Sequence, residues 1–321
     1  MRHNLRIGII ASLAALAACE QSRSVTAPAS RRDAPGDALA SKQGTTSSEM
    51  LITVAATDNV GSDVARMNDD GTNLVMLASG GSVHANPAWA PDGKRIVFAS
   101  DLFGTQPYQA SLYAMNADGT DLTRLTFALA NGTDIDPVGF AAGVVFARGN
   151  GSGVEVSLLG ADGGVTQLTS GPSDVQPAPS PKGKSVAFRR GDEIYVLDLV
   201  TLGVTNLTNT PGCVESSPAY SPSGKQIAFT RNSCGTVAGG IFVMNDDGTE
   251  VTRLTTSNNS LDFGPKWSPD GKRIGFSRAS PGLVSMYQTS IYVMNADGTA
   301  VTQIVPPDLT LNYTLSAWAR Y

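Results

Sequence analysis

One sequence unit recurs through most of the chain and decides which folds are open to it. Its clearest form is Pro-Ala-Trp-Ala-Pro-Asp-Gly-Lys-Arg-Ile-Val-Phe at residues 87–98, and close copies occupy residues 218–229 and 265–276. Weaker copies begin at Pro137 and Pro177, so successive units start 40 to 50 residues apart. A period of this length is typical of a four-stranded propeller blade.

Each unit continues into a second hairpin built around Asp-Gly. Residues 112–120 read Leu-Tyr-Ala-Met-Asn-Ala-Asp-Gly-Thr and lead to Leu-Thr at residues 125–126. Asp-Gly between two apolar strands is a strong hairpin signal, because glycine accepts the positive φ of such turns. Ile-Val-Phe at residues 96–98 is apolar at consecutive positions, which indicates a strand buried on both faces. In the least regular copy, residues 194–207, we assign the turn to Gly203.

The two ends of the repeat region complete a sixth blade. Residues 51–56, 63–67 and 74–77 read as three strands without an innermost strand, and residues 316–319 align with residues 87–90. The sequence therefore predicts an all-β fold, a six-bladed β-propeller of four-stranded antiparallel blades over residues 50–321. Pairing of the N- and C-terminal strands closes the ring and removes the open sheet edge.

Composition agrees with a turn-rich β protein and excludes several functions. The chain has 34 glycines in 321 residues, and its charged residues make up 16%, against about 25% in ordinary proteins. Two histidines leave little for a multi-histidine metal centre. A net charge of −5 without a basic run argues against nucleic acid as a partner.

The first fifty residues read as an export signal followed by a tether. Arg2 and Arg6 precede an apolar run over residues 7–18 that is too short to span a bilayer. The run ends in Leu-Ala-Ala-Cys, which resembles the bacterial lipobox and implies cleavage before Cys19 and its lipidation. The alternative is an ordinary signal with a stray cysteine. We expect a lipoprotein signal peptide at 1–18 and a lipidated, disordered tether at 19–49.

The repeat itself resembles a known family. Pro-x-Trp-Ser-Pro-Asp-Gly-Lys-x-Ile-x-Phe, followed by Tyr-Val-Met-Asn-x-Asp-Gly-Thr and Leu-Thr, is similar to the TolB-type propeller repeat over residues 51–320. TolB is a periplasmic protein with an α/β domain before its propeller, for which this chain has no room. The resemblance implies a TolB-like propeller lipoprotein and leaves a part in the Tol–Pal system open. Glu20 rather than Asp after the cysteine favours anchoring to the outer membrane under the enteric sorting rule.

Six residues stand three positions before the successive repeat starts and should ring the mouth of the central channel. They begin the innermost strands, and they are His84, Asp134, Asp174, Glu215, Asp262 and Tyr313. Crowded carboxylates raise one another's pKa unless a cation neutralises them, so this ring is a candidate cation site, with calcium as the ion, or a clamp for a basic peptide. The alternative is that each acid caps the turn before its own strand through backbone N–H groups.

The long connections between strands lie on the same face and are the second candidate for binding. Recognition is usually carried by variable loops on a rigid scaffold, which nominates Phe103, Tyr108, Met286 and Tyr287. The alternative is that these side chains fold back over the blade rim. Cys213 and Cys234 lie on this face of one blade, and export to an oxidising compartment favours a disulfide over two free thiols.

The chain carries no convincing sign of catalysis. It has no Gly-x-Ser-x-Gly elbow, and nothing follows the sixth blade that resembles a hydrolase domain. Oligogalacturonate lyases resemble this repeat family but use a histidine-rich metal site, which one histidine after the signal cannot supply. We therefore expect no cofactor and an exported, outer-membrane-anchored lipoprotein whose propeller binds an envelope protein or peptide. The alternatives are a carbohydrate-binding or lyase- or hydrolase-like propeller, and a structural surface protein.

Overall fold

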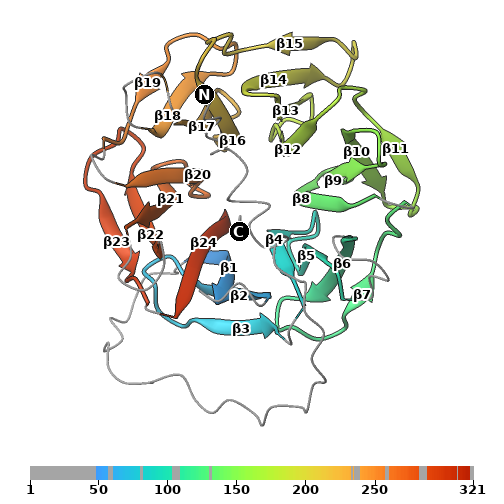
Figure 1. The fold of residues 1–321 in the computed structure, drawn as a ribbon, viewed down its shortest axis with the longest axis horizontal. Helices are drawn as coiled ribbons and strands as arrows, with labels where there is room; N and C mark the ends of the chain where they lie inside the picture. Colours follow the sequence, from blue (N-terminus) through green and yellow to red (C-terminus); the bar gives the residue numbers. More distant parts are fainter. Residues whose placement is uncertain are drawn as a thin grey trace, which may run out of the picture.

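The computed structural model describes residues 48–56, 61–79, 82–102, 109–129, 132–232, 234, 239–256, 260–281, 288–308 and 310–318. In these residues every regular element is a strand, and the strands form six four-stranded antiparallel sheets arranged as the blades of a propeller (Figure 1). The predicted fold is therefore confirmed. No helix in this part of the chain is long and apolar enough to cross a membrane.

We number the blades in chain order. Blade 1 consists of β24 (Leu311–Trp318), β1 (Glu49–Ala56), β2 (Ser62–Asn68) and β3 (Val75–Ala78); blade 2 of β4 (His84–Trp89), β5 (Arg95–Ser100), β6 (Ser111–Asn116) and β7 (Thr123–Arg124); blade 3 of β8 (Asp134–Phe140), β9 (Gly143–Gly149), β10 (Val154–Gly160) and β11 (Val165–Gln167). Blade 4 consists of β12 (Asp174–Pro179), β13 (Ser185–Arg190), β14 (Glu193–Asp198) and β15 (Val204–Asn206); blade 5 of β16 (Val214–Tyr220), β17 (Gln226–Asn232), β18 (Gly240–Asn245) and β19 (Thr252–Arg253); blade 6 of β20 (Leu261–Trp267), β21 (Arg273–Ser280), β22 (Gln288–Asn295) and β23 (Thr302–Val305).

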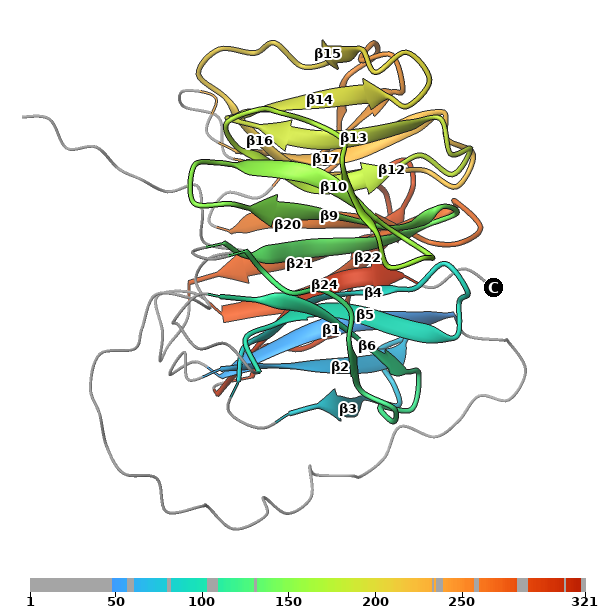
Figure 2. The ribbon, with the colours of Figure 1, turned by 90° about the vertical axis from the view of Figure 1, so that its right-hand side faces the viewer.

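The first strand of each blade lies nearest the propeller axis and the last lies at the outer edge (Figure 1). We call the face that carries the short turns, between the first and second and between the third and fourth strands, the turn face. The opposite face, with the longer connections, is the loop face. Figure 2 shows the strands running between these two faces.

The ring closes through blade 1, as predicted. β24, from the C-terminal end, pairs with β1, and the register places Met50 opposite Trp318. The indole N–H of Trp318 donates to Ser48 Oγ at 2.6 Å, and Ser48 Oγ donates to Asp69 at 2.7 Å. Arg273 of blade 6 donates to the same Asp69 at 2.5 Å, so one carboxylate connects both ends of the described propeller to the neighbouring blade.

The residues that recur from unit to unit each have a structural role in this ring. The phenylalanine of the second strand is fully buried between blades, as Phe98 and Phe229 show. The threonine of Leu-Thr accepts an N–H near the start of the third strand, for example from Leu112 to Thr126 Oγ1 at 2.9 Å. The Asp-Gly turns are stabilised by hydrogen bonds from threonine to aspartate, which lower the pKa of Asp118 and its counterparts in blades 5 and 6.

One predicted turn residue is wrong. In blade 4 the left-handed position of the outer turn is held by Leu202, at φ 58°, and Gly203 does not adopt positive φ. The amide of Leu202 donates to the Asp198 carbonyl at 2.9 Å, as the turn glycines do in the other blades, but this turn is one residue longer. Because of the extra residue, Gly203 lies one position after the left-handed residue. Aligning the repeats by their glycines alone does not reveal this shift.

Candidate functional site: polar groups around the propeller axis

The four acids of the predicted channel mouth each contact an arginine of their own blade. All four carboxylates are fully buried, and the partner stands directly opposite on the second strand. The pairs are Asp134 with Arg148, Asp174 with Arg190, Glu215 with Arg231 and Asp262 with Arg278, with N–O distances of 2.6 to 2.7 Å. The antiparallel register thus gives each acid a cationic neighbour, and the carboxylates do not face one another as the sequence analysis supposed.

These ion pairs are also packed against aromatic rings. Each arginine lies over the buried phenylalanine two residues before it, with 5.1 to 5.4 Å between the guanidinium carbon and the ring centroid. Hydrogen bonding to the aspartates raises the pKa of Arg148, Arg190 and Arg278. Among the described residues, no three His, Cys, Asp or Glu side chains lie close enough together to hold a metal ion.

The turn-capping alternative, through backbone N–H groups, accounts for a secondary contact of Asp174 only, and Glu215 instead accepts a side-chain hydroxyl. Asp174 accepts the backbone N–H of Gly171 at 3.1 Å, and Glu215 accepts the hydroxyl of Thr210 at 2.8 Å. The arginine remains the principal partner in both cases.

His84 and Tyr313 occupy the same position in blades 2 and 1, and neither forms an ion pair with a residue that the structure describes, although the charge of Asp101 acts on His84. The ring nitrogen Nδ1 of His84 lies 2.8 Å from Ser100 Oγ, and its ring meets Phe98 edge-on at 5.6 Å. Burial lowers the pKa of His84 and raises that of Tyr313, so both side chains are neutral at pH 7. Blade 2 therefore carries a neutral pair, His84 with Ser100, and in blade 1 Val54 stands opposite Tyr313.

The lowered pKa of His84 predicts a loss of stability on mild acidification. An unfolded histidine titrates near 6.5, so between that pH and the lower native pKa the unfolded chain binds more protons than the folded one. Stability should fall as the pH drops below about 6.5, and the fall should be smaller in His84→Asn. Melting temperatures of both proteins at pH 7.5 and 5.5 test this, and equal decreases would contradict it.

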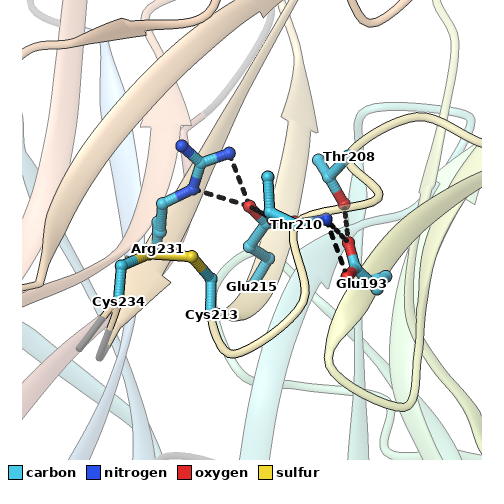
Figure 3. Close-up of a disulfide and its surroundings, with 7 residues drawn as sticks. All are labelled: Glu193, Thr208, Thr210, Cys213, Glu215, Arg231 and Cys234. Atoms are coloured by element: carbon cyan, nitrogen blue, oxygen red, sulfur yellow. Dashed lines mark hydrogen bonds and ion pairs between the residues drawn. A yellow bond between two sulfur atoms is a disulfide. The ribbon is translucent and has the colours of Figure 1, made fainter.

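The predicted disulfide is present on the loop face of blade 5. Cys213 and Cys234 are bonded with an S–S distance of 2.03 Å (Figure 3). Next to it lie the ion pair of Glu215 and Arg231 and the contact of Thr210 with Glu193 (Figure 3). The crosslink holds the start of the innermost strand to the end of the second strand, beside the buried pair.

A second ring of five residues, four of them polar, lies two positions after the first and was not predicted from the sequence. Its members stand in β-bulges of the innermost strands at φ between 51° and 64°, and they are Asn86, Asp136, Gln176, Ser217 and Gly264. We call them the axial ring. Each directly precedes the proline of its repeat, and this shared position was the available signal.

Hydrogen bonds connect the axial ring from blade to blade. The amide of Asn86 donates to Asp136 Oδ1 at 2.5 Å, and the backbone N–H of Gln176 donates to Asp136 Oδ2 at 3.1 Å. The backbone N–H of Ser217 donates in turn to Gln176 Oε1 at 2.8 Å. Four consecutive blades therefore hold one another's polar groups at the axis in fixed orientations.

Lys266 adds one positive charge to this region. It lies on β20 of blade 6, at the repeat position that holds Ala88, Val138, Ala178, Ala219 and Ala317 in the other blades. Blade 6 is opposite blade 3 in the ring, and the charge of Lys266 acts on Asp136 across the axis. Burial lowers the pKa of Lys266 and raises that of Asp136, and the two charges oppose both shifts.

Lys266 makes no hydrogen bond or ion pair to any residue that the structure describes, and its side chain is partly exposed. Asn86, Gln176 and Ser217 are partly exposed as well. The amide of Asn86, the hydroxyl of Ser217 and the ammonium of Lys266 therefore present hydrogen-bonding atoms to the axis. The predicted contacts Phe103, Tyr108, Met286 and Tyr287, and the predicted lipidation site Cys19, lie outside the described residues.

Comparison with known proteins agrees with this architecture. Residues 185–314 match the family model of the TolB beta propeller domain. No curated protein matches the chain. The similarity therefore rests on one family model and on solved structures.

Two of the similar structures are TolB proteins. TolB from Acinetobacter baumannii has a TM-score of 0.70 at 21% identity, with 85% of this chain and 67% of that chain covered. A putative TolB from Agrobacterium tumefaciens has a TM-score of 0.61 at 19% identity, with coverage of 84% and 99%. A puromycin hydrolase is also similar, with a TM-score of 0.54 at 15% identity and coverage of 81% and 45%. At these identities the likeness is one of fold.

Proposed function

We propose that this chain, whose propeller is of the TolB type, is an exported lipoprotein anchored through Cys19 whose propeller binds a protein or peptide of the cell envelope. The signal and lipobox pattern supports export and anchoring. The disulfide between Cys213 and Cys234 supports an oxidising compartment, because such bonds persist outside the cytosol.

The axial ring is the observation that carries the binding proposal. An extended peptide offers alternating N–H donors and C=O acceptors, and the side-chain amide of Asn86 and the hydroxyl of Ser217 can serve both. Lys266 adds a donor for a carboxylate, either an acidic side chain or a chain terminus. The hydrogen bonds between blades hold these groups in place before a ligand arrives, which lowers the entropy cost of binding.

Crosslinked pull-down from intact envelopes tests this function. The wild-type chain should retain envelope proteins or peptides that Lys266→Met retains at least about tenfold less, since Met keeps the length of the side chain without its charge. Lys94→Met, an exposed lysine on the turn face, is the matched control and should retain the wild-type set. Equal capture by Lys266→Met, or binding to a glycan array without protein capture, would contradict the proposal and in the second case favour a carbohydrate-binding propeller.

Anchoring is tested separately. The wild-type chain should incorporate labelled fatty acid and partition with membranes, and Cys19→Ser should do neither. A chain that is exported but never acylated would leave the binding function standing and refute the anchor.

A further inference from the structure

The turn face carries an exposed apolar tip in blade 4. Val200 and Leu202 are 79% and 66% exposed, at the end of the turn between β14 and β15. The corresponding turns of the other blades carry glycine at the left-handed position, at Gly71, Gly119, Gly163, Gly248 and Gly298. Blade 4 is therefore the one blade of the described structure with large aliphatic side chains at this tip.

Leucine is an unfavourable choice for folding at this position. At φ 58° its Cβ is crowded by the backbone, a conformation that glycine adopts freely. The exposed side chain gains little from burial within the domain. A residue that costs stability and faces solvent points to a role for its side chain outside the fold.

The same face has an aliphatic rim. The residue at the start of the outermost strand is aliphatic and 38% to 46% exposed in every blade: Leu74, Leu122, Val165, Val204, Val251 and Val301. Lys182 and Lys184 occupy the neighbouring turn of blade 4, where blades 2 and 6 have Asp-Gly-Lys. Exposed apolar side chains with lysines beside them are typical of surfaces that bind at a lipid interface.

The chain reaches the propeller on this face. Ser48 hydrogen-bonds Asp69, in the β2–β3 turn, and accepts the indole N–H of Trp318, so the residues before it join the domain at the turn face of blade 1. Blade 1 lies opposite blade 4 in the ring. Cys19 is 29 positions before Ser48, in a segment outside the described residues, and the predicted tether of that length would reach about 30 Å on average.

We propose that the turn face lies on the surface of the lipid bilayer that anchors the chain, with Val200 and Leu202 inserted among the lipids. The proposal rests on the lipid anchor of the proposed function. The anchor at blade 1 and the apolar tip at blade 4 give two contacts on opposite sides of the turn face. The turn face of the propeller therefore lies parallel to the membrane, and the loop face points away from it. A short tether makes the second contact effectively intramolecular, at millimolar effective concentration.

Electrostatic attraction contributes little to this contact. Asp118, Asp162, Asp247 and Asp297 lie in turns of the same face and offset the lysines. Insertion of aliphatic side chains is not screened by salt, so docking should be similar at low and high ionic strength.

The test uses the mature Cys19→Ser chain with a histidine tag at its N-terminus, held on vesicles that contain a nickel-chelating lipid. This keeps the tether and removes any dependence on natural acylation. An environment-sensitive fluorophore is attached at Thr201→Cys, next to the tip, or at Ser173→Cys, on the exposed loop face. Fluorescence at position 201 should shift to the blue and be quenched by brominated lipids, and fluorescence at position 173 should not.

Val200→Asn with Leu202→Asn should lower the docked-to-free ratio by about tenfold or more, since two aliphatic side chains leave the lipid. Asparagine tolerates positive φ, so the variant should melt at or above the wild-type temperature, which separates docking from folding. Val165→Asn with Val251→Asn, on the rim, should have a smaller effect.

The proposal would be overturned if the fluorophore at position 201 emitted as in water and was not quenched by brominated lipids. It would also be overturned if the membrane signal was unchanged in the double variant. Protection of position 201 by an envelope extract but not by vesicles would assign the patch to a protein partner and overturn it too. Because the tag replaces the acyl anchor, either result is independent of whether Cys19 is lipidated.

Discussion

A chain that ends at residue 310 should not fold. It lacks β24, which supplies Tyr313, Leu315 and Trp318 to the core, all at most 7% exposed. Burial of three such side chains stabilises a domain by about 5 to 9 kcal/mol, comparable to the 5 to 15 kcal/mol by which a typical domain is stable. The loss also exposes the hydrogen-bonding edge of β1. We expect no cooperative thermal transition and concentration-dependent aggregation.

Circular dichroism and size-exclusion chromatography measure this outcome. Removal of residues 319–321 alone, which follow β24, is the control and should leave the melting temperature unchanged. A synthetic peptide of residues 311–318 should restore folding when added to the short chain, because the missing strand is a separate segment. A truncated protein that melts like the full one would contradict the closure of the ring through blade 1.

Asp262→Ala should destabilise the propeller by about 3 to 5 kcal/mol. Among the changes that we consider, only the truncation should have a larger effect. It leaves the partly buried guanidinium of Arg278, which lies over Phe276, without the carboxylate that it contacts at 2.6 Å. Urea unfolding followed by circular dichroism provides the measurement. The control Arg95→Ala removes a solvent-exposed ion pair with Asp92, at 2.9 Å, and should cost less than about 1 kcal/mol.

The neutral pair of blade 2 suggests a variant that recovers the stability lost in Asp262→Ala. Blade 2 holds His84 and Ser100 where blade 6 holds Asp262 and Arg278. The double variant Asp262→His with Arg278→Ser should therefore be more stable than Asp262→Ala, because no unpaired charge remains buried. If the double variant were the less stable of the two, the isolated guanidinium would not be the source of the cost.

The fold was predictable because each blade repeats the same local signals. Consecutive apolar residues, Asp-Gly turns and a fixed period specify strands and hairpins from neighbours in the sequence. Ring closure was also predictable, since Trp318 matches the tryptophan of the repeat at Trp89.

The arginine partners of the buried acids could also have been predicted from the sequence. Every blade with an acid at the mouth position has Phe-x-Arg in its second strand, as in Phe276-Ser277-Arg278, and the blade with His84 has Phe98-Ala99-Ser100. Antiparallel register brings the two positions face to face. The axial ring was harder to find, because a β-bulge turns its side chains to the axis and five different residue types fill the position.

The attachment of the N-terminal segment to β1 has a mechanical consequence. β1 is hydrogen-bonded on both sides, to β24 and to β2, and its buried residues lie in the middle of blade 1. Tension between a membrane on the turn face and a partner on the loop face would enter the domain along this strand. It would load two ladders of hydrogen bonds in shear at once, so the domain is attached at a point where pulling does not peel a strand from an edge.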